Sequence, residues 1–435
     1  MKLVRLVRLL NQPVASAWWA AYALLLLLAP LLQESSLSQT LLAQTGVAII
    51  ACLSYNLLLG QGGMLSFGHA VYSGIGAFLA MHTLNRVSAG LALPVSLIPL
   101  VGGVASMALG LLLGWVCTKK AGTAFAMITF GMGELAWAMA LVFPGFFGGE
   151  AGISGNRVAG AATLGITFGP QLELNLLIAL YTLVCTALLY AFTRTPLGRM
   201  LNAVRDNPER VAFVGYNPQV VRYLAMAIAT FFAGVAGGLA ALNFEMVTAD
   251  VLSAHRSGAY LLFTVLGGSG YFFGPIIGAV LMVLAFVLLS AWTKAWLLYV
   301  GLMFVLMVMH APGGIAALLV AHWQLLREGG WRRLGLAYLA VFAGGLVALA
   351  GFAALVELVY HLQQLAVLGP QLPFLGARLN VQQGTSWLGA AALLGSGLGL
   401  LRLSCRHWRH QLHGWQRPQR PGSSANCNAA AAGPR

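Results

Sequence analysis

Apolar segments, most of them close to the length of a membrane span, follow one another along most of the chain. About twenty apolar residues in a helix cover the roughly 30 Å of hydrocarbon in a bilayer. Hydropathy predicts twelve segments, at 17–33, 41–60, 63–82, 91–116, 122–143, 173–193, 222–243, 258–270, 272–290, 296–311, 335–359 and 386–404. The eighth is short for a complete crossing and is typical of a tilted half-helix or one limb of a broken span. The pattern predicts an all-α, polytopic transmembrane helical bundle.

The composition supports the same class. Of 435 residues, 59% are hydrophobic and 8% are charged, too few charges to cover the surface of a soluble protein of this size. The five cysteines are scattered without paired spacing, so neither a disulfide framework nor a metal site is predicted. Membrane topology accounts for the net charge of +14 better than a nucleic-acid partner does.

The basic residues predict the orientation. With the N-terminus in the cytoplasm and twelve crossings, only five of the 24 Lys and Arg residues lie outside: Arg86, Arg157, Arg256, Lys294 and Arg378. If 258–270 instead returned to its own side, Arg327, Arg332 and Arg333 would lie outside. The excess of positive charge on cytoplasmic loops favours the crossing. Both termini are therefore predicted to be cytoplasmic in a multi-pass membrane protein.

One polar stretch, from Arg194 to Arg222, interrupts the apolar pattern and is predicted to lie in the cytoplasm. Within it, Asp206 and Asn207 are good helix N-cap types and stand just before Pro208, which suits a first helical turn. A solvated basic loop would explain the arginines alone. It would not explain a capped turn, so the stretch is predicted to be a small folded surface that docks a partner.

Two glycine-rich blocks, at 62–77 and 267–279, follow a similar Gly-Gly…Phe-Gly…Gly pattern in the two halves of the chain. Small residues three or four positions apart also occur at Gly110/Gly114 and Gly234/Gly238. Such faces let helix backbones approach closely. Helix packing alone explains any single glycine, whereas the two related blocks suggest an internal duplication whose halves meet around a pathway.

Few polar residues are predicted inside the membrane. Glu134 lies in the middle of a predicted span, and an acid at that depth is a candidate functional residue, although a protonated or hydrogen-bonded packing role is an equal alternative. His69 and Ser66 lie on the predicted third span and either face the pathway or form hydrogen bonds between helices. The chain has no Gly-x-x-x-x-Gly-Lys-[Ser/Thr] motif, so no ATP-binding loop is predicted, and no catalytic motif was found.

Several motifs resemble one known family. Gln61-Gly-Gly-Met-Leu-Ser-Phe-Gly-His69, the second glycine block with Gly274-Pro275, the stretch Arg205-Asp206-Asn207-Pro208-Glu209, and His310-Ala-Pro-Gly-Gly314 are similar to the signature blocks of permeases of branched-chain amino acid ABC importers, of the LivM-like type. The resemblance covers roughly residues 40–318. It implies an importer permease core at 1–320. A basic linker with two additional transmembrane helices (321–405) and a disordered cytoplasmic tail (406–435) are predicted beyond it.

The resemblance implies roles for two sets of residues. The ATPase-coupling loop would comprise Arg199, Arg205, Asp206, Asn207, Pro208, Glu209, Arg210, Ala212 and Gly215. The candidate translocation pathway would comprise Gly62, Gly63, Ser66, Gly68, His69, Glu134, Gly267, Gly268 and Gly274.

The resemblance also implies partners: cytoplasmic ATPase subunits that bind the ATP, a second related permease, an extracytoplasmic solute-binding protein and the lipid membrane. The resemblance places the chain in a bacterial inner membrane, and the chain itself would carry no cofactor and would not be an enzyme. The solute would be a branched-chain amino acid or a related small polar solute such as urea or an amide. The alternative is a proton-coupled secondary transporter that uses Glu134 and His69, which leaves the capped turn unexplained.

Overall fold

The structure is a computed structural model of the chain, and it describes residues 13–33, 35–159, 168–327, 331–363, 371–374 and 377–415. The chain divides into two compact units, Met1–Val320 and Ala321–Arg435.

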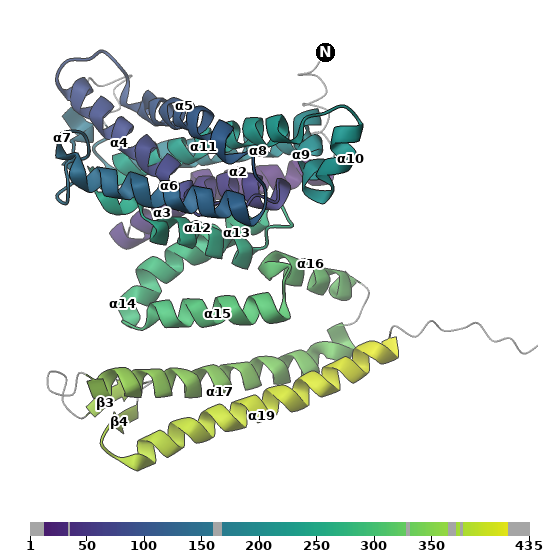
Figure 1. Cartoon of the computed structure of the whole chain (residues 1–435). Helices are drawn as coiled ribbons and strands as arrows, with labels where there is room; N and C mark the ends of the chain where they lie inside the picture. The colour runs from purple at the N-terminus through teal and green to yellow at the C-terminus, as the bar shows by residue number, and fades with distance from the viewer. Residues whose placement is uncertain are drawn as a thin grey trace, which may run out of the picture. The chain divides into compact units, whose positions relative to one another are not determined.

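The first unit is built from helices that lie alongside one another, with the short α9 and α10 at one end and α7 at the opposite end (Figure 1). In chain order, its helices are α2 (Pro13–Leu32), α3 (Ser36–Asn56), α4 (His69–Ser88), α5 (Ile98–Cys117), α6 (Thr123–Val142), α7 (Pro144–Phe147), α8 (Gln171–Arg194), α9 (Pro196–Asp206), α10 (Pro208–Phe213), α11 (Pro218–Phe244), α12 (Ala254–Gly267), α13 (Gly274–Val283), α14 (Ser290–Trp292) and α15 (Trp296–His310). Helix α16 (Gly314–Arg327) begins in this unit and ends beyond Val320.

Shorter elements join these helices. Helix α3 continues into a π-helical segment, η1 (Leu57–Gln61), and α13 continues into another, η5 (Leu284–Leu289). The 3₁₀ turns are η2 (Val95–Leu97), η3 (Arg157–Ala159) and η4 (Ala249–Leu252). The strands β1 (Ile153–Ser154) and β2 (Met246–Val247) form an antiparallel pair.

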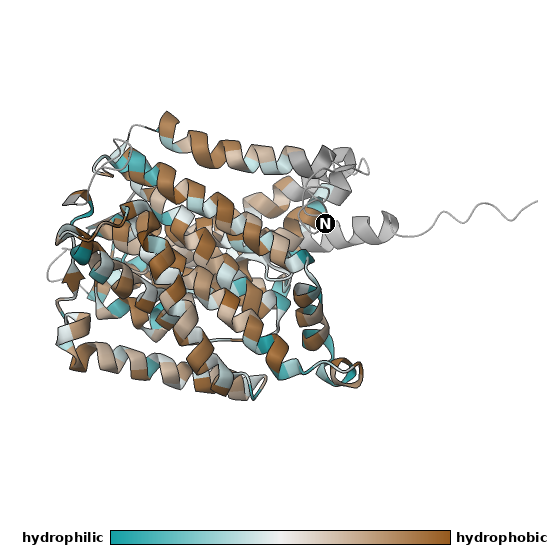
Figure 2. Cartoon of the chain, turned by 90° about the horizontal axis from the view of Figure 1, so that it is seen from above, coloured by the Kyte–Doolittle hydropathy of each residue, from teal (hydrophilic) through white to brown (hydrophobic). Residues whose placement is uncertain are grey.

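The predicted all-α polytopic bundle is confirmed. Within the described residues, eight helices are long and apolar enough to cross a membrane, or nine if the bent pair of α15 and α16 forms one span. Brown apolar residues occur along all parts of the coloured helices, with pale and teal residues among them (Figure 2). Helix α12 has 14 residues, and at about 1.5 Å per residue it is about 21 Å long, shorter than a complete crossing.

The predicted third span, 63–82, is wrong at its beginning. The helix begins only at His69, and residues 62–68 form an irregular segment. Gly63 has a positive φ of 63°, which is incompatible with a regular helix. Gly62, Gly63 and Gly68 of the first glycine block therefore lie in a break between α3 and α4, and Gly74 and Gly76 lie in α4.

Helices α4, α5 and α11 pack at a seam of small residues. A Cβ added to Gly76 would lie 2.5 Å from both the Cα and the carbonyl oxygen of Gly234, and one added to Gly102 would lie 2.6 Å from the carbonyl oxygen of Gly76. Three backbones therefore touch at one level, each through a glycine. Beside them the Ser106 hydroxyl donates to the carbonyl of Tyr72 at 2.6 Å, which ties α5 to α4.

The second unit consists of two long helices joined by a β-hairpin. These are α17 (Trp331–Gln363), β3 (Gln371–Phe374), β4 (Ala377–Asn380) and α19 (Gly384–Trp415), with β3 and β4 antiparallel. Both helices contain a segment able to span a membrane, at Leu339–Gln363 and Gly384–Ser404. Because α19 continues to Trp415, residues 406–415 are helical, and the prediction that disorder begins at 406 is wrong there. Residues 416–435 of the predicted tail lie outside the described residues.

Candidate functional site

The polar stretch folds as two short capped helices, α9 and α10, which we call the elbow (residues 195–217). The hydroxyl of Thr195 accepts from the backbone N–H of Gly198 at 3.2 Å at the beginning of α9. The side-chain oxygen of Asn207 accepts from the N–H of Arg210 at 3.0 Å at the beginning of α10. The prediction of a capped turn at Asn207 is confirmed. Asp206 instead ends α9 and pairs with Arg205 at 3.0 Å.

The elbow has one face against the bundle and one face open. Leu201, Val204 and Val211 are buried in the hydrophobic core of the first unit. Of the predicted coupling-loop residues, Asn207 is half-buried and the others are exposed: Arg199, Arg205, Asp206, Pro208, Glu209, Arg210, Ala212 and Gly215. Gly215 has a positive φ of 93°, which glycine adopts without strain as the chain leaves α10.

The open face also carries apolar side chains that the sequence reasoning did not select. Phe213 is 89% exposed, Val214 73% and Tyr216 53%. A contiguous run of exposed apolar residues rimmed by polar ones marks an interaction site. In the sequence these three residues are apolar positions within the polar stretch 194–222, whereas the prediction of a docking surface rested on the charged and capping residues of that stretch.

The two glycine blocks are breaks between helices, and each requires glycine. In the first break, a Cβ on Gly68 would overlap the carbonyl oxygen of Thr129 in α6. In the second, Gly268 has a φ of 113° and a Cβ on Gly274 would overlap the carbonyl oxygen of Gly268. A side chain at Gly68 would collide with the backbone of α6, and one at Gly274 with the backbone of the break itself, so neither position has room for one.

The second break also meets η1, the π segment that leads into the first break. A Cβ on Gly60, at the end of the π segment η1, would overlap the carbonyl oxygen of Ser269 in the second break and the side-chain oxygen of Asn56. Gly62 is buried and a Cβ there would lie 3.2 Å from Leu201 of the elbow. The structure therefore brings parts of the two predicted sets, the coupling loop and the glycine blocks, into contact.

A small polar cluster lies buried beside the first break. The Ser54 hydroxyl donates its only proton to the carbonyl of Ala229 at 2.7 Å. His69 must therefore donate from Nε2–H to the Ser54 oxygen, at 2.9 Å. Its Nδ1 is then an acceptor, and it has no partner among the described residues, as is also true of the side-chain oxygens of Ser66 and Asn56. Buried polar atoms left without a partner in the protein are available to a water or a polar solute.

The structure does not join His69 to Glu134. Glu134 is half-buried on α6, and within the described residues its carboxylate forms no hydrogen bond or ion pair. His69 contacts Ser54 and the rings of Tyr55 and Tyr72. A direct proton relay between the two residues has no contact to support it in the described part of the chain.

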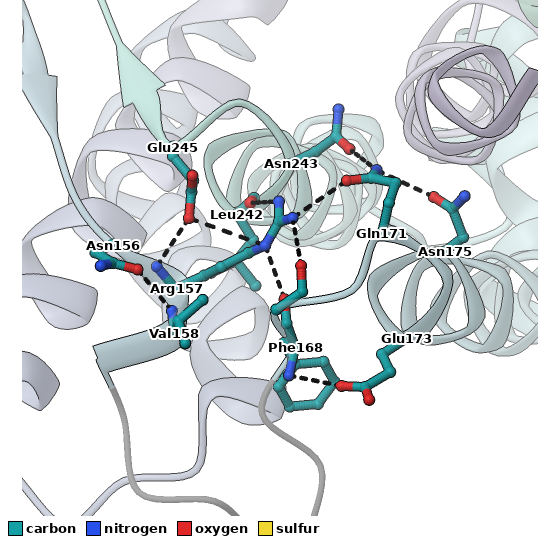
Figure 3. A network of polar contacts seen from close by, with 11 residues as sticks. Asn156, Arg157, Val158, Phe168, Gln171, Glu173, Asn175, Leu242, Asn243 and Glu245 are labelled. Atoms are coloured by element: carbon teal, nitrogen blue, oxygen red, sulfur yellow. Dashed lines mark hydrogen bonds and ion pairs between the residues drawn. The ribbon is translucent and has the colours of Figure 1, made fainter. Parts of the chain in front are cut away.

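A larger polar network lies at the far end of α11 from the elbow (Figure 3). The guanidinium of Arg157 donates to the carbonyls of Phe168 at 2.8 Å and Gly169 at 3.2 Å, and to the side chain of Gln171 at 3.2 Å. Glu245 lies 3.9 Å from the same guanidinium and accepts from the Arg157 backbone N–H. The sequence predicted Arg157 outside the membrane but not this clamp. Among the residues that the structure describes, no group of His, Cys, Asp and Glu could hold a metal.

Comparison with known proteins identifies the family. Residues 38–311 match the model of the branched-chain amino acid transport system permease component. The chain belongs to this family. It is 29% identical over 294 residues to the high-affinity branched-chain amino acid transport system permease protein LivM of Salmonella typhimurium strain LT2, covering 62% of this chain and 68% of the relative. LivM of Escherichia coli K12 is 27% identical over 294 residues, with the same coverage. No solved structure matches.

Membership of this family establishes the class of protein. The chain is a multi-pass membrane permease of the kind that works in a transport system with partner subunits, and such permeases are not enzymes. The match begins in α3 and ends just after α15, so the two helices of the second unit lie beyond it.

Proposed function

We propose that the chain is the permease subunit of an ATP-driven importer that moves branched-chain amino acids, or a related small polar solute such as urea or an amide, into the cell. Separate ATPase subunits would bind and hydrolyse ATP. A second related permease would complete the pathway, and an extracytoplasmic binding protein would deliver the solute. The names of the two relatives support this class of solute.

The open face of the elbow carries the proposal. Phe213 at the end of α10, with Val214 and Tyr216 just after it, stands beside the exposed Glu209 and Arg210 of a helix that is capped at its beginning. In water such a face costs free energy unless a partner covers it. An apolar centre with charged neighbours fits the groove of a cytoplasmic ATPase subunit, and the predicted cytoplasmic position of the elbow agrees with this partner.

The glycine breaks give the proposal a pathway. Helix α4 begins at the fully buried His69, which contacts Ser54 near the end of α3, and Ser54 in turn donates to Ala229 in the middle of α11, so the first turn of α4 lies inside the bundle. Irregular backbone at this depth is tolerated where it is covered by protein or lines a polar path. The pathway would pass Ser66 and His69, whose unpaired polar atoms could bind the polar groups of the solute.

The proposal is tested with the complete transporter in proteoliposomes, using radiolabelled L-leucine. Replacing Glu209 and Arg210 together by alanine, or Phe213 by aspartate, should leave the permease inserted but release the ATPase and abolish uptake. Removing one partner of a charged, hydrogen-bonded contact at an interface costs about 2–5 kcal/mol. Lys120→Ala, which removes an exposed charge from the loop between α5 and α6 and leaves the elbow intact, is the control. Normal ATPase association and normal uptake in both test variants would overturn the assignment.

A further inference from the structure

Arg205 extends along the surface of the bundle to the end of α3 instead of joining the open face of α10. Its Nη1 donates to the carbonyl oxygen of Gly60. Its Cγ lies 2.7 Å from the position that a Cβ on Gly63 would occupy. Gly63 is therefore constrained twice, by its positive φ and by the arginine that lies over it.

The neighbouring residues of α9 contact the same turn. The side-chain amide of Asn202 donates to the side-chain oxygen of Gln61 at 2.9 Å. Leu201 is buried beside Gly62. One face of α9 thus contacts residues 60–63, which include the end of the π segment η1 and the first residues of the break.

The contact has a physical reason. The last carbonyls of a helix have no partner within the helix, and a cation is favoured there because it meets the negative end of the helix dipole. The guanidinium of Arg205 satisfies one such carbonyl, while Asp206, 3.0 Å away, restricts its orientation. On its other side Gly60 touches Ser269 of the second break. Short π segments occur frequently at functional sites.

We propose that Arg205 is the positioning residue that transmits movement of the elbow to the two glycine breaks. This inference rests on the proposed function, because the elbow moves only if an ATPase subunit binds it. When the ATPase displaces α10, α9 carries Arg205 and Asn202 with it, and their bonds to Gly60 and Gln61 shift η1. Because Gly60 touches Ser269, the second break moves in the same step.

The first experiment compares Arg205→Ala, Arg205→Lys and Lys120→Ala in the complete transporter. Lys120 is an exposed basic residue in the loop between α5 and α6, outside the coupling loop and the glycine blocks. Arg205→Ala should keep the ATPase bound and hydrolysing ATP, while L-leucine uptake per inserted permease falls roughly tenfold, the effect of losing a charge-assisted hydrogen bond. The ATP hydrolysed per leucine should rise. Arg205→Lys should recover part of the uptake, and Lys120→Ala should match the wild type.

The second experiment replaces the lost link by a covalent one. Gln61→Cys and Asn202→Cys are joined by a short bifunctional thiol reagent, with Cys405 and Cys427 replaced by serine; Cys52, Cys117 and Cys185 are buried. If α9 and η1 move as one body, the cross-link should preserve uptake by the chain that retains Arg205. In the chain that carries Arg205→Ala, the cross-link should restore uptake.

The outcomes separate the possible explanations. A capping role without transmission predicts less uptake at an unchanged ratio of ATP to leucine, and no rescue by the cross-link. Loss of uptake on cross-linking the Arg205 chain would mean that the two segments must separate, which overturns the proposal. If Arg205→Ala fails to insert into the membrane, the proposal is tested by the uptake of Arg205→Lys and by the uptake of the cross-linked chain that retains Arg205. If the wild-type complex shows no ATP-dependent uptake, the proposed function itself is wrong. If Arg205→Ala behaves like the wild type, only the role of Arg205 in transmission is wrong.

Discussion

Replacing Gly76 by alanine should destabilise the first unit, because its added Cβ would meet backbone and not a flexible side chain. The Cβ would lie 2.5 Å from the Cα and the carbonyl oxygen of Gly234. Carbon atoms in ordinary contact are about 3.5–4.0 Å apart, so α4 and α11 would have to separate by roughly 1 Å. The seam with Gly102 on α5 would open with them. Overpacking of this kind costs about 1–3 kcal/mol.

The matched control is Gly131→Ala on α6, where a Cβ would meet nothing within 4 Å. Both substitutions gain the same helix preference of alanine over glycine, about 0.5–1 kcal/mol. The difference between the two variants therefore isolates the overpacking cost. In thermal unfolding of the purified chain in detergent, Gly76→Ala should melt about 2 °C or more below Gly131→Ala. Equal midpoints, or a higher one for Gly76→Ala, would refute the packing argument.

Two further predictions concern the glycine breaks and the clamp. Gly68→Leu and Gly274→Leu should each lower leucine uptake per inserted permease, since both side chains would overlap a backbone carbonyl; wild-type uptake by both would show that the breaks are not tightly packed. Arg157→Ala should loosen the segment around Phe168, because hydrogen bonds from a charged donor contribute about 1.5–3 kcal/mol each, and limited proteolysis should cut faster there; unchanged cleavage would contradict a clamp.

The sequence predicted the class of fold well because hydropathy over about twenty residues reports directly on a membrane span. It also predicted the cap at Asn207, because capping depends on a local residue type and a following proline. The position of the elbow at one end of the bundle followed from the same polar stretch.

Other features depended on contacts between distant segments and could not be predicted in this way. The first glycine block was placed on a helix, since hydropathy does not distinguish an apolar helix from an apolar break. The contact between Arg205 and Gly60 joins residues that are 145 positions apart. The exposure of Phe213 was missed because an apolar residue is expected to be buried unless its surroundings are known.

The central claim is that ATP hydrolysis on partner subunits drives transport through this chain. The most direct measurement is L-leucine uptake into proteoliposomes under two conditions. In one, the permease is reconstituted with its ATPases, second permease and binding protein, and ATP is supplied. In the other, this chain alone is given a proton gradient. The account predicts uptake in the first condition and none in the second. Accumulation by the chain alone, abolished by Glu134→Gln or His69→Ala, would contradict it.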